Sequence, residues 1–390
     1  MIENVKKHLK DDLIPFWSNL MDKEYGGFYG YMDYKLRLDK QSIKGCILNS
    51  RILWFFSNAY MILGEESLLE EAKHAFRFLK EYCWDKEYGG VYWSLTYDGR
   101  PEDTTKHTYN QAFAVYALSS YYKAAGDGEA LKLAEALYQI IEQRCRDEKG
   151  YLEAFDRQFC PTDNEKLSEN GVLAERTMNT LLHVLEAYTE FYDVTQNLHV
   201  KNNLKLILDI VAEKIYNPAL HRQEVFFDLE YHTLLDLHSY GHDIEAAWLI
   251  DRCVDVLDDD SYRAKITPIT RVLTEEIYKT AFTGRNLSNE CEKGKVDTDC
   301  VWWVQAEAIV GFMNGFEHDS SRNDYLEAAN AIWGFIKDYM IDHRKGSEWY
   351  WLVDKDGKPY MDKPIVDQWK CPYHNGRMCM EVIRRNIDVT

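Results

Sequence analysis

The sequence Asp22-Lys-Glu-Tyr-Gly-Gly-Phe-Tyr29 recurs almost unchanged 63 residues later as Asp85-Lys-Glu-Tyr-Gly-Gly-Val-Tyr92. Weaker copies of the pattern stand at Gly150-Tyr-Leu-Glu-Ala-Phe155 and at Glu348-Trp-Tyr-Trp351. Each copy joins a glycine-marked turn to alternating apolar and polar residues, which is typical of a short strand or hairpin. Recurrence at a long period indicates a repeat architecture, in which one structural unit is used several times.

A helical pattern lies on each side of these motifs. Between Leu68 and Leu79, apolar residues recur at the three- and four-residue spacing that places them on one face of a helix, and the same holds from Ile52 to Leu63. The repeating unit is therefore predicted to be an outer helix, a short hairpin and an inner helix. The outer helices are predicted at 65–82, 128–145, 200–215, 260–281 and 322–341, and the inner helices at 49–63, 109–125, 174–193, 241–256, 301–316 and 373–386.

Six inner-helix starts in 390 residues fit a closed ring of six helix pairs. If the inner helices run in the same direction, their N-terminal ends surround one pocket. Polar and aromatic side chains suited to holding a sugar lie in the first turn or two of these helices: Arg51, Tyr109, Asn179, His183, His242, Glu245, Trp303, Glu307 and His374. Because no Pro-, Ser- or Gly-rich linker interrupts the rhythm, residues 1–390 are predicted to form a single domain.

The composition narrows the classes of function. A net charge of −19 argues against binding to nucleic acid or to an anionic membrane surface. No apolar stretch approaches membrane-spanning length, and the first residues lack the apolar core of a signal peptide. The nine cysteines show no CxxC spacing, so we expect reduced thiols in a cytoplasmic protein. Neither GxGxxG nor a P-loop is present, so a nucleotide cofactor has no support.

The segment 238–248, His-Ser-Tyr-Gly-His-Asp-Ile-Glu-Ala-Ala-Trp, carries the first candidate for chemistry. His242 and Glu245 are three residues apart and therefore neighbours on one helix face. A carboxylate beside an imidazole can hold its tautomer and raise its basicity, which predicts an oriented acid/base histidine. The alternative is helix capping, since Asp243 and Glu245 are both favourable in a first turn.

A metal site is a further alternative for this segment, because His238, His242 and Glu245 could together chelate zinc. Gly241 argues against it, since a helix that begins there leaves His238 in the preceding loop rather than one turn below His242. The HExxH pattern is also absent. The sequence therefore favours an acid/base role over capping, and both over a metal site.

The segment 369–381, Trp-Lys-Cys-Pro-Tyr-His-Asn-Gly-Arg-Met-Cys-Met-Glu, carries the second candidate. Pro372 suits the first turn of a helix, where its missing N–H does no harm. His374 is then predicted at the mouth of the last inner helix. A lone histidine is more often structural than catalytic, but the matching place of His242 in its own repeat favours a catalytic role.

Trp303 and Glu307 form the third candidate, because residues four apart share a helix face. Stacking on a sugar ring together with recognition of a hydroxyl is the functional interpretation. The alternative is a tryptophan of the core beside a solvated glutamate.

Four other residues have similar alternatives. Asn179 and His183 are again four apart and could face the pocket together. Arg51 opens a helix and could bind substrate, although such a residue is more often a salt-bridge partner. Tyr109 could belong either to the pocket or to the core.

Two histidines, an arginine and acids in an aromatic ring fit proton abstraction next to a carbonyl. A neutral imidazole can remove the weakly acidic C2–H of an open-chain aldose at pH 7 if the enediolate oxygen is stabilised. Arg51 could supply that stabilisation because it is permanently charged. Reprotonation from the opposite face changes the configuration at C2, either from a second histidine or after rotation of the intermediate. A histidine must also help to open the sugar ring, and no metal or redox cofactor is required.

The motifs beginning at Arg51, His238, Val301 and Trp369 resemble the N-acylglucosamine 2-epimerase superfamily over essentially the whole chain, and most closely its bacterial branch that acts on cellobiose. The resemblance implies an all-α (α/α)6 barrel, a toroid of six inner and six outer helices with short β-hairpins in the connecting loops. It implies epimerisation of cellobiose to 4-O-β-glucosyl-mannose, with lactose and other β-1,4 disaccharides accepted.

The same resemblance assigns residues to roles. His242 and His374 would be the acid/base pair, with Glu245 and Arg51 needed for activity. The positions that match the family's pocket are Tyr109, Asn179, His183, Trp303, Glu307 and Trp369. Trp369 is our candidate platform for the second sugar. We expect a monomer with a small-molecule disaccharide as its partner and with neither metal nor cofactor.

Two other functions compete with this one. A monosaccharide isomerase or 2-epimerase acting on mannose or N-acylglucosamine would share the proton abstraction and differ in the subsite for a second sugar. A glycoside hydrolase on the same toroid would need two carboxylates and a positioned water. Glu245, Glu307 and Asp243 could be nominated for it, but both histidines would be left without a role. Carbohydrate binding without catalysis is weaker still, since binding alone needs no paired imidazoles.

Overall fold

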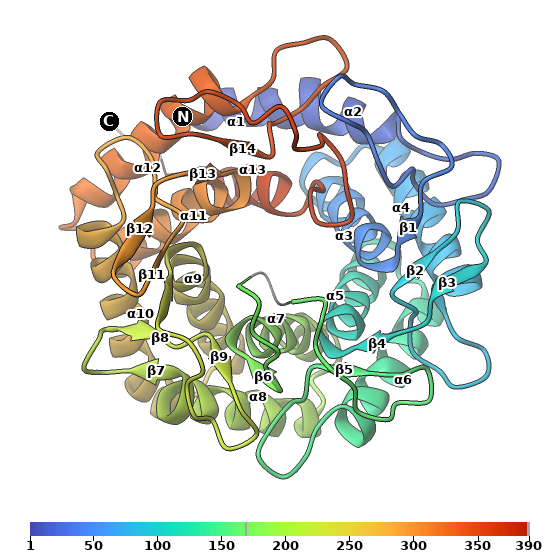
Figure 1. Ribbon diagram of the computed structural model, residues 1–390, viewed down its shortest axis with the longest axis horizontal. Coiled ribbons are helices and arrows are strands. Elements are labelled where there is room, and N and C mark those ends of the chain that lie inside the picture. Colours follow the sequence, from blue (N-terminus) through green and yellow to red (C-terminus); the bar gives the residue numbers. More distant parts are fainter. Residues whose placement is uncertain (168–169, 388–390) are drawn as a thin grey trace.

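The computed structural model describes residues 1–167 and 170–387, whose helices form a closed ring in two layers (Figure 1). The six inner helices are α3 (Cys46–Leu63), α5 (Thr108–Ala125), α7 (Met178–Thr195), α9 (Tyr240–Leu257), α11 (Trp302–His318) and α13 (His374–Arg385). Each inner helix packs on its two neighbours, and α13 closes the ring against α3. The closed ring of six helix pairs predicted from the sequence is confirmed. Among the described residues, no helix combines the length and apolar character that crossing a bilayer requires.

The outer layer pairs one helix with each inner helix. Its members are α1 (Ile2–His8) with α2 (Ile14–Ser18), α4 (Glu66–Phe78), α6 (Gly128–Arg144), α8 (Leu198–Ile210), α10 (Asp260–Thr280) and α12 (Asn323–Phe335). Single π-helical turns extend four of these segments: η1 (Leu9–Leu13), η2 (Leu79–Cys83), η3 (Val211–Ile215) and η4 (Ile336–Met340). The sequence predicted only five outer helices. The sixth is the N-terminal segment, which packs on α13, so this pair joins the two ends of the chain.

Short strands form a belt around one end of the barrel. A strand leads directly into an inner helix and pairs with a strand of the next repeat, and all these pairings are antiparallel. The pairs are β1 (Lys44–Gly45) with β2 (Ser94–Leu95), β4 (Lys106–His107) with β5 (Ala154–Phe155), β6 (Arg176–Thr177) with β9 (Phe226–Phe227), β10 (Leu237–Ser239) with β11 (Glu290–Glu292), and β13 (Cys300–Val301) with β14 (Leu352–Val353). The backbone N–H of Met32 donates to the carbonyl of Val366 at 3.0 Å and links the last repeat to the first. The belt therefore holds the N-terminal ends of the inner helices around one opening.

Two further strands and one separate hairpin extend this belt. β3 (Pro101–Asp103) adds to the sheet of β1 and β2, and β12 (Lys295–Asp297) pairs with β11 to make a hairpin beside β10. β7 (Tyr216–Asn217) and β8 (Arg222–Gln223) form a separate two-stranded hairpin. Short hairpins in the connecting loops, as predicted from the repeated motif, are therefore confirmed.

The aspartate that opens each near-identical motif organises its turn. One oxygen of Asp22 accepts hydrogen bonds from the backbone N–H groups of the two residues after Lys23, and Asp85 does the same in the second copy. The other oxygen of Asp22 accepts from the buried ammonium of Lys44 at 2.6 Å, and Lys106 lies 3.1 Å from Asp85. Both lysines stand two residues before an inner helix. The motif thus fixes where an inner helix begins.

Replacing Asp85 with asparagine is expected to lower the free energy of unfolding by about 3–5 kcal/mol, because the buried Lys106 ammonium loses its carboxylate. Both side chains are 0% exposed, so water cannot replace the lost partner. Urea denaturation measures the change. The control is Glu70→Gln, which removes an exposed pair with Lys73 and should cost less than about 1 kcal/mol. Equal losses in the two variants would contradict the role given to the buried pair.

Candidate active site

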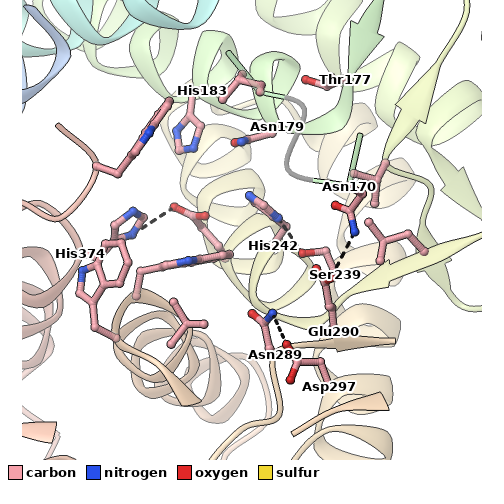
Figure 2. A pocket seen from close by; sticks show the side chains of 18 of the residues that line it. Asn170, Thr177, Asn179, His183, Ser239, His242, Asn289, Glu290, Asp297 and His374 are labelled. Atoms are coloured by element: carbon pink, nitrogen blue, oxygen red, sulfur yellow. Dashed lines mark hydrogen bonds and ion pairs between the residues drawn. The ribbon is translucent and has the colours of Figure 1, made fainter. Parts of the chain in front are cut away.

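A cavity of about 220 Å³ opens at the end of the barrel where the inner helices begin. Side chains from all six inner helices line it. Nine of the ten residues predicted from the sequence are among them: Arg51, Tyr109, Asn179, His183, His242, Glu245, Trp303, Trp369 and His374. Figure 2 shows His183, His242 and His374 pointing toward the same space from three different helices. The tenth residue, Glu307, lies beneath the cavity instead.

The register of the inner helices explains why distant residues meet here. Arg51, His183, Glu245 and Glu307 are each the sixth residue of an inner helix, as is Phe113 in α5. Because the strand belt holds the helix starts at one level, residues with the same position in their helices form a layer across the barrel. His242 and His374 stand nearer the opening, at the third residue of α9 and the first of α13.

The imidazole of His374 is anchored by a carboxylate. Its Nδ1 lies 2.8 Å from Oε1 of Glu307, and since a carboxylate only accepts, Nδ1 carries the hydrogen and Nε2 keeps its lone pair. Burial, together with the charges of Arg377 and Arg51, holds the pKa of His374 well below its usual range. His374 is therefore neutral at pH 7, with Nε2 available as a base.

The imidazole of His242 is anchored by a hydroxyl. Its Nδ1 lies 2.7 Å from Oγ of Ser239, and burial, reinforced by the nearby His183, lowers the pKa of His242 to about 3. The indole of Trp303 lies close to both histidines, with its ring centroid 4.7 Å from that of His242 and 5.5 Å from that of His374. Two neutral imidazoles thus flank one aromatic surface.

The expectation that Glu245 orients His242 is wrong. The two residues do share a helix face, but the Glu245 carboxylate is hydrogen-bonded to the guanidinium of Arg377, and Ser239 takes the place expected for it. His238 lies in β10 with its Nε2 2.9 Å from Asp243. The carboxylate that His238 contacts is thus that of Asp243, in the first turn of α9. His238, His242 and Glu245, which were considered as zinc ligands, therefore do not converge.

Arg51 is buried without a carboxylate. Its guanidinium donates to the Tyr109 hydroxyl at 2.8 Å and to the carbonyl of Trp369 at 3.5 Å, and it stacks on Phe113 with 4.2 Å to the ring centroid. Within the described part of the chain it forms no ion pair, and its Nε has no hydrogen-bond partner. A buried charge left uncompensated is costly, so Arg51 is not the salt-bridge partner of the alternative interpretation. It supplies positive charge to the cavity.

Arg377 forms the floor beneath the cavity. Its guanidinium contacts the carboxylates of Glu186 at 2.5 Å, of Glu307 at 2.7 Å and of Glu245. Burial alone would raise the pKa of Glu186, but Arg377 and the hydrogen bond from His183 more than offset this and lower it to about 2. The ionised Glu186 in turn holds Nδ1 of His183 at 2.9 Å. One arginine thus links the partners of His183 and His374.

Glu307 was expected to recognise a sugar hydroxyl, and the structure places it otherwise. Its carboxylate is fully buried and accepts from His374, Arg377 and the indole N–H of Trp248. No oxygen of Glu307 is left for a ligand. Its position four residues after Trp303 correctly placed it near the pocket, but it contacts the histidine rather than the cavity.

The surroundings of Glu245 favour its protonated form. Burial and the negative charge of Glu307 raise its pKa, and its Oε2 has no partner among the described residues while the side chain lines the cavity. Ligand atoms of Glu245, Glu307 and His374 lie within 4.8 Å of one another, as in a metal site. The guanidinium of Arg377 contacts both carboxylates, however, and already supplies the positive charge that a metal ion would bring. Glu245 is therefore placed to donate a hydrogen bond into the cavity.

The cavity is rich in polar atoms that await a partner. In the described part of the chain, the buried side-chain atoms of its lining residues without a hydrogen bond are Arg51 Nε, Asn179 Oδ1, Glu245 Oε2, Trp302 Nε1 and Trp351 Nε1. Buried polar atoms are normally paired, so this concentration is typical of a site for a polyhydroxylated ligand. Trp369 faces the same space and packs edge-on against Trp93.

The opening is lined by residues that the sequence did not single out. They come from the hairpin of β11 and β12, its flanks and the loop that follows β5: Asn170, Asn289, Glu290, Asp297 and Asp299. Figure 2 shows Asn170 hydrogen-bonded to Glu290 and Asn289 hydrogen-bonded to Asp297.

The sequence analysis also missed Arg377 and Glu186, although each lies three residues after a predicted site histidine. That spacing was the signal used for His242 and Glu245, and it could have found both.

Comparison with known proteins agrees with this geometry. A model of the N-acylglucosamine 2-epimerase family matches residues 26–375. The chain is 52% identical over 403 residues to cellobiose 2-epimerase from Eubacterium cellulosolvens, with 99% of each chain covered. Among solved structures, that of a sugar epimerase from a ruminal bacterium aligns with a TM-score of 0.98 and 51% identity and covers 100% of both chains. Cellobiose 2-epimerase from Bacillus thermoamylovorans B4167 aligns with a TM-score of 0.95 and 43% identity, covering 98% of this chain and 99% of that one.

The variant Glu307→Gln is expected to lower kcat by about 10- to 100-fold, because an amide keeps the shape but cannot stabilise a protonated His374. The KM should change little, since Glu307 does not line the cavity. Steady-state kinetics measures both. The matched control is Glu190→Gln, which alters another buried glutamate paired with an arginine, Arg252, away from the cavity. Wild-type kcat in the Glu307 variant would show that this carboxylate does not act on His374.

Proposed function

The chain belongs to the N-acylglucosamine 2-epimerase family, and we propose that it epimerises C2 of the reducing-end glucose of cellobiose and related β-1,4 disaccharides such as lactose. The product is a 4-O-β-glycosyl-D-mannose. The enzyme is an isomerase, and its relatives at 52% identity are cellobiose 2-epimerases. The observation that carries the proposal is the pair of neutral imidazoles beside an unpaired, buried Arg51.

Ring opening comes first, because C2–H is acidic only when C1 is a carbonyl. One group must remove the proton from the O1 hydroxyl and another must protonate the ring oxygen. A neutral imidazole can do the first, and Glu245 in its acid form can do the second. The raised pKa of Glu245 supports its part in this step.

Proton abstraction then falls to His374. Its Nε2 lone pair takes the C2 proton, and the electrons of the C–H bond form the enediolate while the negative charge moves to O1. Glu307 stabilises the resulting imidazolium through Nδ1–H, at the 2.8 Å separation given above. Arg51 stabilises the oxyanion, and its charge has a large effect because the site is shielded from water.

Return of the proton to the opposite face gives the manno configuration. Return from His242 would require that imidazole to be protonated beforehand, which its pKa of about 3 opposes. Rotation of the intermediate instead brings the other face of C2 to His374, which already holds the proton. The neutral state of both histidines therefore favours a single proton carrier.

The second sugar unit would extend from the cavity toward the opening. Trp369 and the hairpin of β11 and β12 lie on that side, which supports a disaccharide over a monosaccharide as substrate. The hydrolase alternative lacks support, since Glu307 does not line the cavity and both Glu245 and Glu307 contact Arg377. Glu307 is thus engaged by His374 and Arg377, and Asp243 by His238, so neither is free to act with Glu245 as acid and nucleophile.

Proton NMR of cellobiose incubated with EDTA-treated protein tests the proposal. We expect signals of a mannose-type reducing end, no free glucose, and a rate unaffected by EDTA, because Arg51 and Arg377 supply the positive charge. Free glucose would mean hydrolysis. Unchanged cellobiose together with conversion of mannose or N-acetylglucosamine would mean a monosaccharide enzyme.

The variant Arg51→Lys is expected to lower kcat by about 100-fold despite the retained charge, because the ammonium cannot keep the contacts to Tyr109 and Trp369 while donating to the oxyanion. Steady-state kinetics with cellobiose measures the loss. Arg252→Lys is the matched control, since Arg252 is paired with Glu190 and both lie in the C-terminal halves of their inner helices, outside the cavity lining. Full activity of the Arg51 variant would reduce this residue to a packing role.

A further inference from the structure

His374 and His242 differ in the group that holds the imidazole. Nδ1 of His374 faces a carboxylate, whereas Nδ1 of His242 faces the hydroxyl of Ser239. A carboxylate fixes one tautomer because it only accepts hydrogen bonds, but a hydroxyl can either donate or accept. The tautomer of His242 therefore depends on where the Ser239 proton goes.

The hydroxyl of Ser239 does not form the hydrogen bond that is usual at its position. It is the N-cap residue of α9, yet its side chain forms no capping hydrogen bond. Thr177 holds the same place before α7, and there the side chain caps the helix by accepting from the backbone N–H of Thr180. Serine favours such capping, so the turn of Ser239 toward His242 forgoes that stabilisation.

The available donors and acceptors indicate which way the hydrogen bond between Ser239 and His242 runs. Among the described residues, Nδ1 of His242 is the one hydrogen-bond partner of the Ser239 hydroxyl, at 2.7 Å. If the oxygen accepted from Nδ1–H, its own proton would lack a protein acceptor, although Ser239 is only 7% exposed. If the hydroxyl donates to Nδ1, both groups are satisfied. The proton of the neutral ring then resides on Nε2.

We propose that Ser239 is a positioning residue that holds His242 as the Nε2–H tautomer, so that His242 is the hydrogen-bond donor of the cavity while His374 is its base. The neutral charge of His242 agrees with this assignment. In the cavity, Nε2–H would donate to an oxygen of the open-chain sugar next to C2. Such a bond strengthens as charge develops on that oxygen.

This inference rests on the proposed function for its effect on rate, but the tautomer can be measured without any substrate. Long-range proton–nitrogen NMR correlations of the free protein labelled with 15N-histidine distinguish a protonated from an unprotonated ring nitrogen. The signals of His242 are those lost in the variant His242→Gln. We expect the wild-type protein to show Nε2 protonated and Nδ1 unprotonated, and a protonated Nδ1 would overturn the proposal.

Variants of Ser239 give the second readout. Ser239→Ala should leave His242 as a mixture of tautomers and lower kcat by about tenfold or more with little change in KM. Ser239→Thr should restore most of both, because Thr177 shows that the equivalent position accepts threonine. The matched control is Ser57→Ala, which removes a buried hydroxyl bonded to the carbonyl of Leu53.

The possible results distinguish the role of Ser239 from the proposed epimerase function. An alanine variant with wild-type kcat and an unchanged tautomer overturns the role of Ser239. A wild-type protein that does not epimerise cellobiose, yet shows the Nε2–H tautomer, overturns the proposed function and leaves the assignment of Ser239 standing. If the alanine variant does not fold, the wild-type spectrum and the threonine variant still decide the matter.

Discussion

The side of the barrel that carries the chemistry depends on one buried guanidinium. Arg377 comes from the last inner helix and contacts carboxylates from α7, α9 and α11, so it joins four helices at one point. Burying such charges is costly unless they are paired and well hydrogen-bonded. Because the carboxylates compensate Arg377, they are also held where two of them can orient His183 and His374. The contacts of Arg377 with these carboxylates, which close the floor of the barrel, therefore also hold the groups that orient the two imidazoles.

Arg377 and Arg51 share a chemical type but differ in environment, and the difference separates structure from function. Arg377 meets three carboxylates, whereas Arg51 meets a phenol hydroxyl, a carbonyl and aromatic faces. The first charge is neutralised inside the protein. The second remains available to a ligand and suits an oxygen that becomes negative only during the reaction. The cavity therefore presents a positive charge to its ligand, which is what the proposed enediolate intermediate requires.

Local spacing in the sequence was sufficient for the ring and for most of the site, and insufficient for contacts between helices. The inner helix predicted at 241–256 is found at Tyr240–Leu257, and the one at 301–316 at Trp302–His318. The sixth outer helix was not predicted because it and its inner helix, α13, come from opposite ends of the chain. Glu245 was assigned to His242 because they are neighbours on one helix, yet its partner, Arg377, lies 132 residues away. Such a choice between partners depends on which helices become adjacent, and the spacing within one helix does not contain that information.

In the proposed reaction, a proton leaves C2 of the sugar and a proton returns to its other face. Cellobiose incubated with the enzyme in deuterated water until equilibrium, and then analysed by NMR, tests this most directly. The account predicts a mannose-type reducing end that carries deuterium at C2, because the proton held by an imidazole exchanges with solvent, and no such product with His374→Ala. Formation of that product by His374→Ala at the wild-type rate would contradict it, since inversion would then proceed without this histidine.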